Sequence, residues 1–458
     1  MLDLALAGFF VGLMALGLRR PFLWVLAYLY VDILSPQKIS WFLLASIPVS
    51  LIVFVAAFGG WLVTDDKRDC RFSLRQMLIV ILLAWCGYTT LGADFPVEAA
   101  SKWSWVWKAL VFAIFLPLTL RNRLRIEAAA LVMVLSAGAI IIGGGIKTAL
   151  GGGGYGSLYL LVNDNTGLYE GSTLSTVAIA IIPLVFWLAR YGTIFPPDWR
   201  VRLFAAALIL ACLLIPIGTQ TRTGLLCIAF LGALSLRTVK RRFLYLGLAA
   251  AAALISIPFL PDSYTARMST IESHQSDESA STRIAVWQWT WDYVQDHPFG
   301  GGFDAYLGNR IRYLKKDAVT DGGVTDVETS YIVDAGRAYH SAYFEILGEQ
   351  GFPGLFVWLL LHGLGLIQLE MVRRKLRGSD NPQDRADAGL ANALQQGNLV
   401  YLLGALFVGV AYQPFIFMLI GLQIALVQQV RRRASRKTFR GARPAPRRMQ
   451  PVGAGDEA

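Results

Sequence analysis

The chain has 458 residues, of which 55% are hydrophobic and 16% are charged, and its mean hydropathy is +0.50. A soluble domain usually carries about 25% charged residues, so this composition excludes an ordinary soluble globular protein. The net charge is +11, and the four cysteines have neither the spacing of a metal site nor that of a disulfide framework. We interpret them as small buried hydrophobic residues.

Apolar runs without charge recur along the chain, for example at 41–63 and 77–93. Such runs approach or reach the roughly 17–25 residues that a membrane-spanning helix needs, and the alternation typical of a membrane β-barrel is absent. The predicted fold is therefore all-α, a polytopic helical bundle of about 12 transmembrane helices. The candidate spans are 2–18, 21–36, 41–63, 77–93, 105–120, 126–146, 171–189, 203–218, 224–236, 243–260, 340–371, 393–412 and 414–430. The first run lacks a positively charged leader, so we expect a retained helix and not a signal peptide.

Basic residues crowd alternate connections between these spans, and most of the 42 Lys and Arg share the side of the C-terminal tail. The positive-inside rule makes that side cytoplasmic. The Arg-rich segment 431–448 is also compatible with nucleic acid, but topology and contact with lipid headgroups explain it more simply. We therefore expect membrane lipids, and no nucleic acid, as its partners.

These patterns divide the chain into four regions. Residues 1–260 are predicted to be N-terminal transmembrane helices, 261–339 an extracytoplasmic loop, 340–430 C-terminal transmembrane helices, and 431–458 a disordered cytoplasmic tail.

The loop 261–339 is the one long connection and is acidic on balance. Ser281–Tyr293 has hydroxyl residues at a plausible N-cap and apolar residues at helical intervals, which predicts a helix. Trp287, Trp289 and Trp291 suggest that this helix lies at the membrane interface. A loop of this length on a compact scaffold is usually functional, so we expect the active site here.

Several common motifs are missing. The glycine-rich runs Gly143–Gly145 and Gly151–Gly154 are not followed by Gly-Lys-Ser/Thr, so they indicate turns and not a phosphate-binding loop. The chain also contains no His-Glu-x-x-His, no metal-ligand cluster and no Gly-x-Ser-x-Gly. Accordingly, we predict neither a metal site nor a cofactor.

Three polar residues at the extracytoplasmic ends of spans are candidates for function. Arg222 lies in a short turn between two apolar spans, where a charge either binds an anion or extends to the interface. Arg283 begins the loop helix and is by itself compatible with an ordinary solvated arginine. His340 opens the next membrane helix, and in a first turn the helix dipole favours the neutral imidazole that a general base requires. A structural role for this histidine remains the alternative.

The pattern His340-Ser341-x-Tyr343-x-x-x-Leu347-Gly348-Glu349-x-Gly351-x-x-Gly354 resembles the signature of the bacterial O-antigen ligase and polymerase family. Further pieces of the resemblance are Thr221-Arg222-Thr223-Gly224, Ser281-Thr282-Arg283, Pro298-x-Gly300-x-Gly302 and Asn163-Asp164-Asn165. The resemblance covers roughly residues 160–370, and the sequence around His340 is also similar to that of exosortase-associated O-glycosylation ligases. The chain departs from the family at Thr221 and Thr223, where serine and glycine often flank the arginine.

The resemblance implies a metal-independent, inverting glycosyltransferase of the bacterial inner membrane whose active site faces the periplasm. Its donor would be a glycan on undecaprenyl pyrophosphate. The resemblance assigns His340 as the general base and Arg222 and Arg283 as ligands of the pyrophosphate. It adds Asn165, Gln220 and Tyr339 as further substrate-binding residues.

The acceptor is less specified by the sequence. Our prediction is a lipopolysaccharide O-antigen ligase, whose acceptor is lipid A-core. An O-antigen polymerase or a protein or exopolysaccharide O-glycosylation ligase remains an alternative within the family. A transporter or flippase of lipid-linked sugars is the alternative from another class, which would favour ionisable residues at the midplane of several helices.

Overall fold

The computed structural model describes residues 2–40, 42–67, 70–151, 167–236, 247, 278–321 and 324–441. Asn165, the predicted span 243–260 (apart from residue 247) and the tail beyond residue 441 lie outside the described residues.

The described elements are mostly helices. They are α1 (Leu2–Arg19), α2 (Phe22–Leu34), α3 (Pro36–Ile39), α4 (Val49–Thr64), α5 (Leu74–Leu91), α6 (Pro96–Thr119), α7 (Arg123–Gly151), α8 (Gly171–Tyr191), α9 (Trp199–Gly218), α10 (Arg222–Leu236), α13 (Glu278–Asp296), α14 (Ala342–Leu376), α15 (Pro382–Gly404) and α16 (Pro414–Gly441). Two short 3-10 helices are η1 (Gly167–Tyr169) and η3 (Ala305–Gly308), and the strands are β1 (Arg310–Asp321) and β2 (Val324–Ala335).

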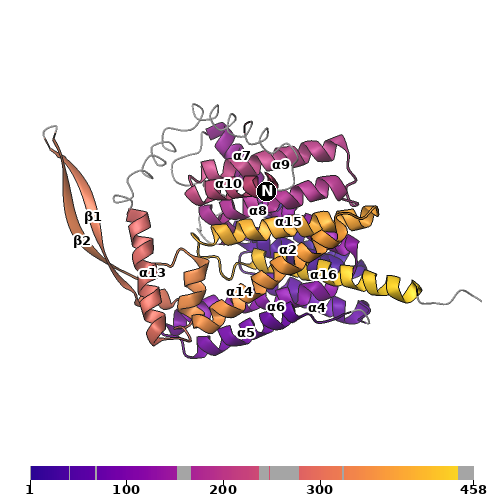
Figure 1. Ribbon diagram of the computed structural model, residues 1–458, viewed down its shortest axis with the longest axis horizontal. Coiled ribbons are helices and arrows are strands. Elements are labelled where there is room, and N and C mark those ends of the chain that lie inside the picture. Colours follow the sequence, from indigo (N-terminus) through magenta and orange to yellow (C-terminus); the bar gives the residue numbers. More distant parts are fainter. Residues whose placement is uncertain are drawn as a thin grey trace, which may run out of the picture.

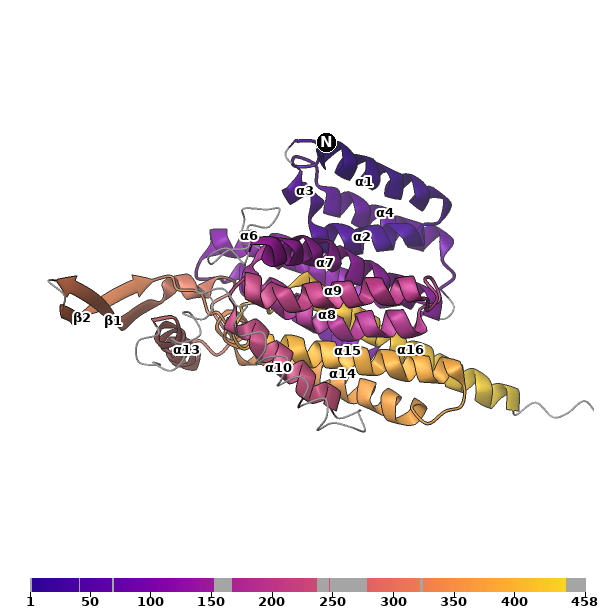
Figure 2. The ribbon, with the colours of Figure 1, turned by 90° about the horizontal axis from the view of Figure 1, so that it is seen from above.

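The long helices run in roughly the same direction and form one bundle (Figure 1). Helices α1 and α4 lie along one edge of the bundle, and α14 lies along the opposite edge (Figure 2). α13 and the two strands project from one end, whereas the C-terminal end of α16 leaves at the other end (Figures 1 and 2). The two ends of the bundle therefore differ in the elements that extend beyond them.

Local signals in the sequence account for where several helices begin. Ser73 accepts a hydrogen bond from the Gln76 backbone, and the Gln76 side chain bonds back to Ser73, which makes a capping box at α5. α15 starts with Asn381 as its cap and Pro382 in its first turn. The predicted span 41–63 is shorter in the structure because α4 begins only after Pro48.

Among the described residues, six helices are long and apolar enough to cross a membrane: α5, α7, α8, α9, α14 and α16. Helices α2, α4 and α10 are apolar but shorter. The all-α membrane class that we predicted is thus confirmed. The number of about 12 spans stays a prediction of the sequence.

The region after α10 contains both an expected and an unexpected element. The predicted loop helix is present as α13, three residues longer at each end than the 281–293 pattern. The loop is not only helical, however, because β1 and β2 pair antiparallel from Arg310 opposite Ala335 to Asp321 opposite Val324. The sequence pattern did not predict this hairpin, because most of its pairs join residues that are far apart along the chain, up to the 25 positions between Arg310 and Ala335. The Gly322-Gly323 pair in the sequence was the available turn signal.

Candidate functional site

His340 lies in the short connection between the hairpin and α14. Its backbone is left-handed, with φ of 48°, and Ser341 is the N-cap of α14. His340 therefore precedes the helix, and our placement of this residue in the first helical turn was wrong. This conformation is uncommon for a residue other than glycine, and His340 stays accessible to solvent just before α14 while part of its ring is enclosed by surrounding protein.

The loop helix α13 is fixed against this connection by one tryptophan. The Trp287 indole donates a hydrogen bond to the Tyr339 carbonyl oxygen at 2.9 Å. Its ring stacks on Phe344 with ring centroids 5.0 Å apart and planes 5° apart. Arg283 lies one turn before Trp287 on the same face of α13. Trp287 thereby holds Arg283 toward the start of α14.

Arg283 is close enough to His340 for its charge to act on the imidazole. Burial lowers the pKa of the His340 imidazole below its usual value, and the charges of Arg283 and Arg337 lower it further, while Glu170 opposes them. The neutral imidazole is therefore favoured at neutral pH, as we expected. The causes are the surrounding protein and two arginines, whereas the sequence suggested the helix dipole.

Glu170 brings a third part of the chain to this site. It caps α8, because its carboxylate accepts hydrogen bonds from the backbone of Ser172 at 2.9 Å and of Thr173 at 2.5 Å. Its charge also acts on His340. Sequence reasoning missed both Glu170 and Arg337. Glu170 could have been noticed as a carboxylate before Gly-Ser-Thr, but nothing local connects it to residue 340.

Arg222 is the first residue of α10, directly after the turn that follows α9. A hydroxyl cluster ties this turn to the start of α8, since Ser175 Oγ lies 2.8 Å from both Thr219 Oγ1 and Thr221 Oγ1. Gln220 is buried in the turn with φ of 52°. The departure from the family at Thr221 thus supplies a methyl-bearing hydroxyl to this cluster. Arg222, the first residue of α10, therefore lies beside the start of α8, which Glu170 caps.

Tyr339 is buried next to the histidine. Its ring meets Tyr306 edge to face at 5.5 Å, and its hydroxyl oxygen has no hydrogen-bond partner among the described residues. A buried hydroxyl without a partner is costly, so this oxygen is an unsatisfied polar atom beside the histidine. Of the predicted site residues, the structure therefore brings His340, Arg283 and Tyr339 together and sets Gln220 and Arg222 at the neighbouring start of α8.

A buried ion-pair network underlies the site. Lys102 on α6 lies 2.8 Å from Glu345 and 2.7 Å from Glu349, both on α14, and 3.6 Å from Asp304. Glu345 also accepts a hydrogen bond from the Ala411 backbone at 3.0 Å. Removing one partner would leave a buried charge uncompensated, so the network locks the start of α14 to α6. No local pattern in the sequence singles out Lys102.

Two separate motifs meet through their backbones. Gly301 and Gly302 donate to the carbonyl oxygens of Gly348 and Glu349, each at 3.0 Å, and Phe352 donates to Pro298 at 3.0 Å. This backbone joint, residues 298–302 against 348–352, connects the end of α13 to a kink in α14. The glycine-rich segment and the segment after His340 therefore form one structural unit in this chain.

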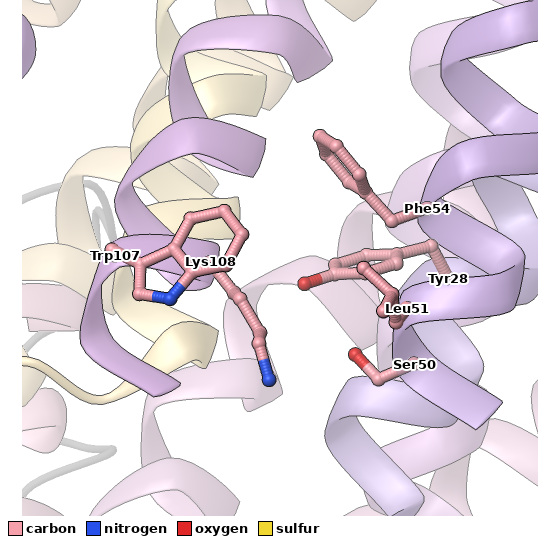
Figure 3. A pocket seen from close by; sticks show the side chains of 6 residues that line it. All are labelled: Tyr28, Ser50, Leu51, Phe54, Trp107 and Lys108. Carbon is pink, nitrogen blue, oxygen red and sulfur yellow. The ribbon is translucent and has the colours of Figure 1, made fainter. Parts of the chain in front are cut away.

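A small cavity elsewhere in the bundle lies between α2, α4 and α6, with Tyr28, Ser50 and Lys108 among its lining residues (Figure 3). Its volume of about 10 Å³ is close to the space of a single water molecule, which is far too small for a sugar. Within the described part of the chain, no three His, Cys, Asp or Glu side chains are grouped so that they could hold a metal ion.

Comparisons with known protein families divide the chain into two matched regions, one of which contains the candidate site. Residues 1–193 match a family described as being of unknown function (DUF5935). Residues 204–359, which include Arg222, Arg283 and His340, match the family model described as O-Antigen ligase. No curated protein matches the chain. Together with the apolar helices, this match over residues 204–359 supports an O-antigen ligase-family membrane protein.

Proposed function

We propose that this protein transfers an O-antigen polysaccharide from undecaprenyl pyrophosphate to a terminal sugar hydroxyl of lipid A-core. The observation that carries the proposal is the pair His340 and Arg283, held together by Trp287 at the start of α14. A neutral imidazole beside a guanidinium combines a proton acceptor with a ligand for phosphate oxygens.

The reaction follows from these groups. The acceptor oxygen attacks the anomeric carbon while His340 takes its proton, and the bond from that carbon to the phosphate oxygen breaks. The electron pair leaves with undecaprenyl pyrophosphate, and a new glycosidic bond forms. A single displacement inverts the anomeric configuration, because no covalent intermediate is formed.

The arginines bind the pyrophosphate leaving group. Guanidinium presents a planar fork of donors that matches phosphate oxygens and keeps its charge at all relevant pH values. In our proposal Arg283 and Arg222 stabilise the negative charge on the departing pyrophosphate, and Tyr339 and Gln220 contact the substrate nearby.

The ends of the bundle support a periplasmic site in the bacterial inner membrane. α13 and the hairpin lie at one end, and the Arg-rich end of α16 lies at the other (Figure 1). His340 follows the hairpin directly, just before α14. The positive-inside rule then makes the α16 end cytoplasmic.

Purified protein in liposomes tests the proposal with three parallel acceptors: lipid A-core, a second lipid-linked glycan, and a peptide or exopolysaccharide carrying hydroxyls. The expected product is glycosylated lipid A-core, formed in the presence of EDTA because the arginines carry the charge of the leaving group.

His340→Ala is the negative control in this assay. Elongated lipid-linked glycan as the sole product would mean a polymerase, and a modified peptide or exopolysaccharide would mean an O-glycosylation ligase. Loss of activity in EDTA with recovery on adding Mg²⁺ would contradict the role given to the arginines.

A further inference from the structure

A large groove lies on the bundle between α8, α9 and α15, three helices that are neighbours in both views (Figures 1 and 2). Its volume is about 1070 Å³, above the roughly 300–1,000 Å³ of pockets for drug-sized molecules. Phe186 on α8 and Leu210 on α9 are 59% and 60% exposed in it. The groove therefore suits a large, mainly apolar ligand.

The length of the groove matches one membrane leaflet. On α9 its lining extends from Arg202 to Leu213, which at 1.5 Å per residue is about 16 Å. Half of a typical hydrocarbon core is about 15 Å. An acyl chain that starts at the arginine would therefore reach about the middle of the bilayer.

Positive charge is concentrated at one end of the groove. Arg190 is in the last turn of α8 and Arg202 is in the first turn of α9, and both side chains are exposed. Neither forms an ion pair with a residue that the structure describes. The carboxylates at the nearby start of α15 do not neutralise them, because Asp384 and Asp387 pair with Arg433.

Amide side chains follow the arginines deeper in the groove. α15 is antiparallel to α8, since Gly389 packs against Tyr191 and Gly397 packs against Ala180. Asn392 and Gln396 lie one turn apart on α15 and line the groove below the arginine end. Their amides are suited to the ester oxygens of a glycerolipid.

We propose that this groove is a specific site for an anionic phospholipid. The phosphate contacts Arg190 and Arg202, the ester oxygens accept from Asn392 and Gln396, and the acyl chains lie against Phe186, Leu210 and their neighbours. Basic pockets between transmembrane helices select anionic lipids by this combination of charge and apolar surface. The site is distinct from His340 and independent of the transfer reaction.

The test is competition between two lipids that differ in headgroup charge. Detergent-solubilised protein is mixed with equimolar phosphatidylglycerol and phosphatidylcholine of identical chains, and bound lipid is counted by native mass spectrometry. Each arginine near the headgroup is expected to contribute about a fivefold preference, so together about 25-fold. Arg190→Gln or Arg202→Gln should each lose about fivefold, and the double variant should bind the two lipids about equally.

Arg200→Gln is the matched control, because Arg200 is on the same helix as Arg202 but does not line the groove and lies over the Trp199 ring. It should keep the wild-type preference. Ala206→Trp fills the groove and should reduce binding of both lipids. Thermal unfolding in detergent checks that all variants fold.

Three results would overturn the proposal: equal binding of the two lipids by the wild type, an equal loss in Arg200→Gln, or unchanged lipid binding by well-folded Ala206→Trp. The second result would mean a nonspecific attraction to positive charge, and the third would place the lipid elsewhere.

Discussion

The charges around His340 set the pH range in which its imidazole can accept a proton. Burial, Arg283 and Arg337 lower the pKa, and Glu170 raises it. The base form is the neutral one, so it is present above the pKa of the folded protein and is lost as the pH falls through that value. The acidic limb of the pH–rate profile should therefore have its midpoint below about 6.5, the value of an ordinary histidine.

Variants of the neighbouring charges should move this limb in opposite directions. Arg337→Gln removes a charge that lowers the pKa, so the limb should shift to higher pH. Glu170→Gln removes a charge that raises the pKa, so the limb should shift to lower pH. His340→Ala should lose roughly 10²–10⁴-fold in rate and lack the limb altogether, while donor binding is nearly kept. A well-folded His340→Ala protein with near-normal transfer would reduce His340 to a structural residue.

Gly351 shows how strongly the backbone joint restricts the sequence. Its φ is 64°, and a Cβ placed there would lie 2.2 Å from the Pro298 carbonyl oxygen. Gly351→Ala should therefore destabilise the protein by on the order of 1–3 kcal/mol, since both the backbone conformation and the contact resist a side chain. The unfolding temperature in detergent measures this loss.

Gly363 provides the control on the same helix, because a Cβ there has nothing within 4 Å. Gly363→Ala should be neutral or stabilising by about 0.5–1 kcal/mol, as alanine favours a helix over glycine. Similar unfolding temperatures for the two variants would show that the joint does not contribute to stability.

At the scale of elements, Trp287 fixes the position of α13 against the segment before α14 and against α14 itself. Trp287→Ala removes the ring stack on Phe344 and the hydrogen bond to Tyr339. These contacts are worth about 1–3 kcal/mol together, so the amides of α13 should exchange roughly tenfold faster or more with deuterated solvent. The rate of glycan transfer at low donor concentration should also fall in this variant, because Trp287 no longer holds Arg283 toward the start of α14.

Trp291→Ala is the comparison within α13. Its ring is 52% exposed and meets Phe352 only edge to face at 6.1 Å. Exchange in α13 should change little in this variant. Equal effects of the two substitutions would mean that the tryptophans hold α13 through general hydrophobicity and not through the Trp287 contacts.

The elements also show what a sequence can and cannot predict. α13 could be predicted because helical periodicity is local, and Arg222 could be located because it follows an apolar run. The hairpin was missed because Arg310 finds its partner, Ala335, only in three dimensions. Lys102 and Glu170 were missed for the same reason: their partners on or before α14 are far away in sequence.

For the whole molecule, the testable property is the side of the membrane on which each end lies. Single cysteines at Asp321 and Ser435, introduced after replacement of the four native cysteines, should differ in their reaction with an impermeant maleimide. We expect Asp321→Cys to be labelled from the periplasmic side and Ser435→Cys only after permeabilisation, because basic residues gather at the Ser435 end.

Labelling of Ser435→Cys alone in intact spheroplasts would contradict the proposed orientation and, with it, the proposed transfer from a lipid-linked donor in the periplasm. Both cysteines must also react in permeabilised membranes, which shows that each is accessible. Counting the spans requires cysteines at further positions, because α2, α4 and α10 are apolar but shorter than the six candidate membrane spans.

The backbone joint between residues 298–302 and 348–352 has a consequence for protein engineering. Under the proposed function, exchanging acceptor specificity between relatives would mean transplanting the segment before α14, cut where that helix begins at Ala342. Such a chimera would pair the glycines of one protein with the Gly348–Phe352 segment of another, although each side leaves no room for a mismatched side chain. The unit of exchange should therefore extend through Phe352 into the bundle and include the strip around Asp94, whose backbone also bonds to Gly301.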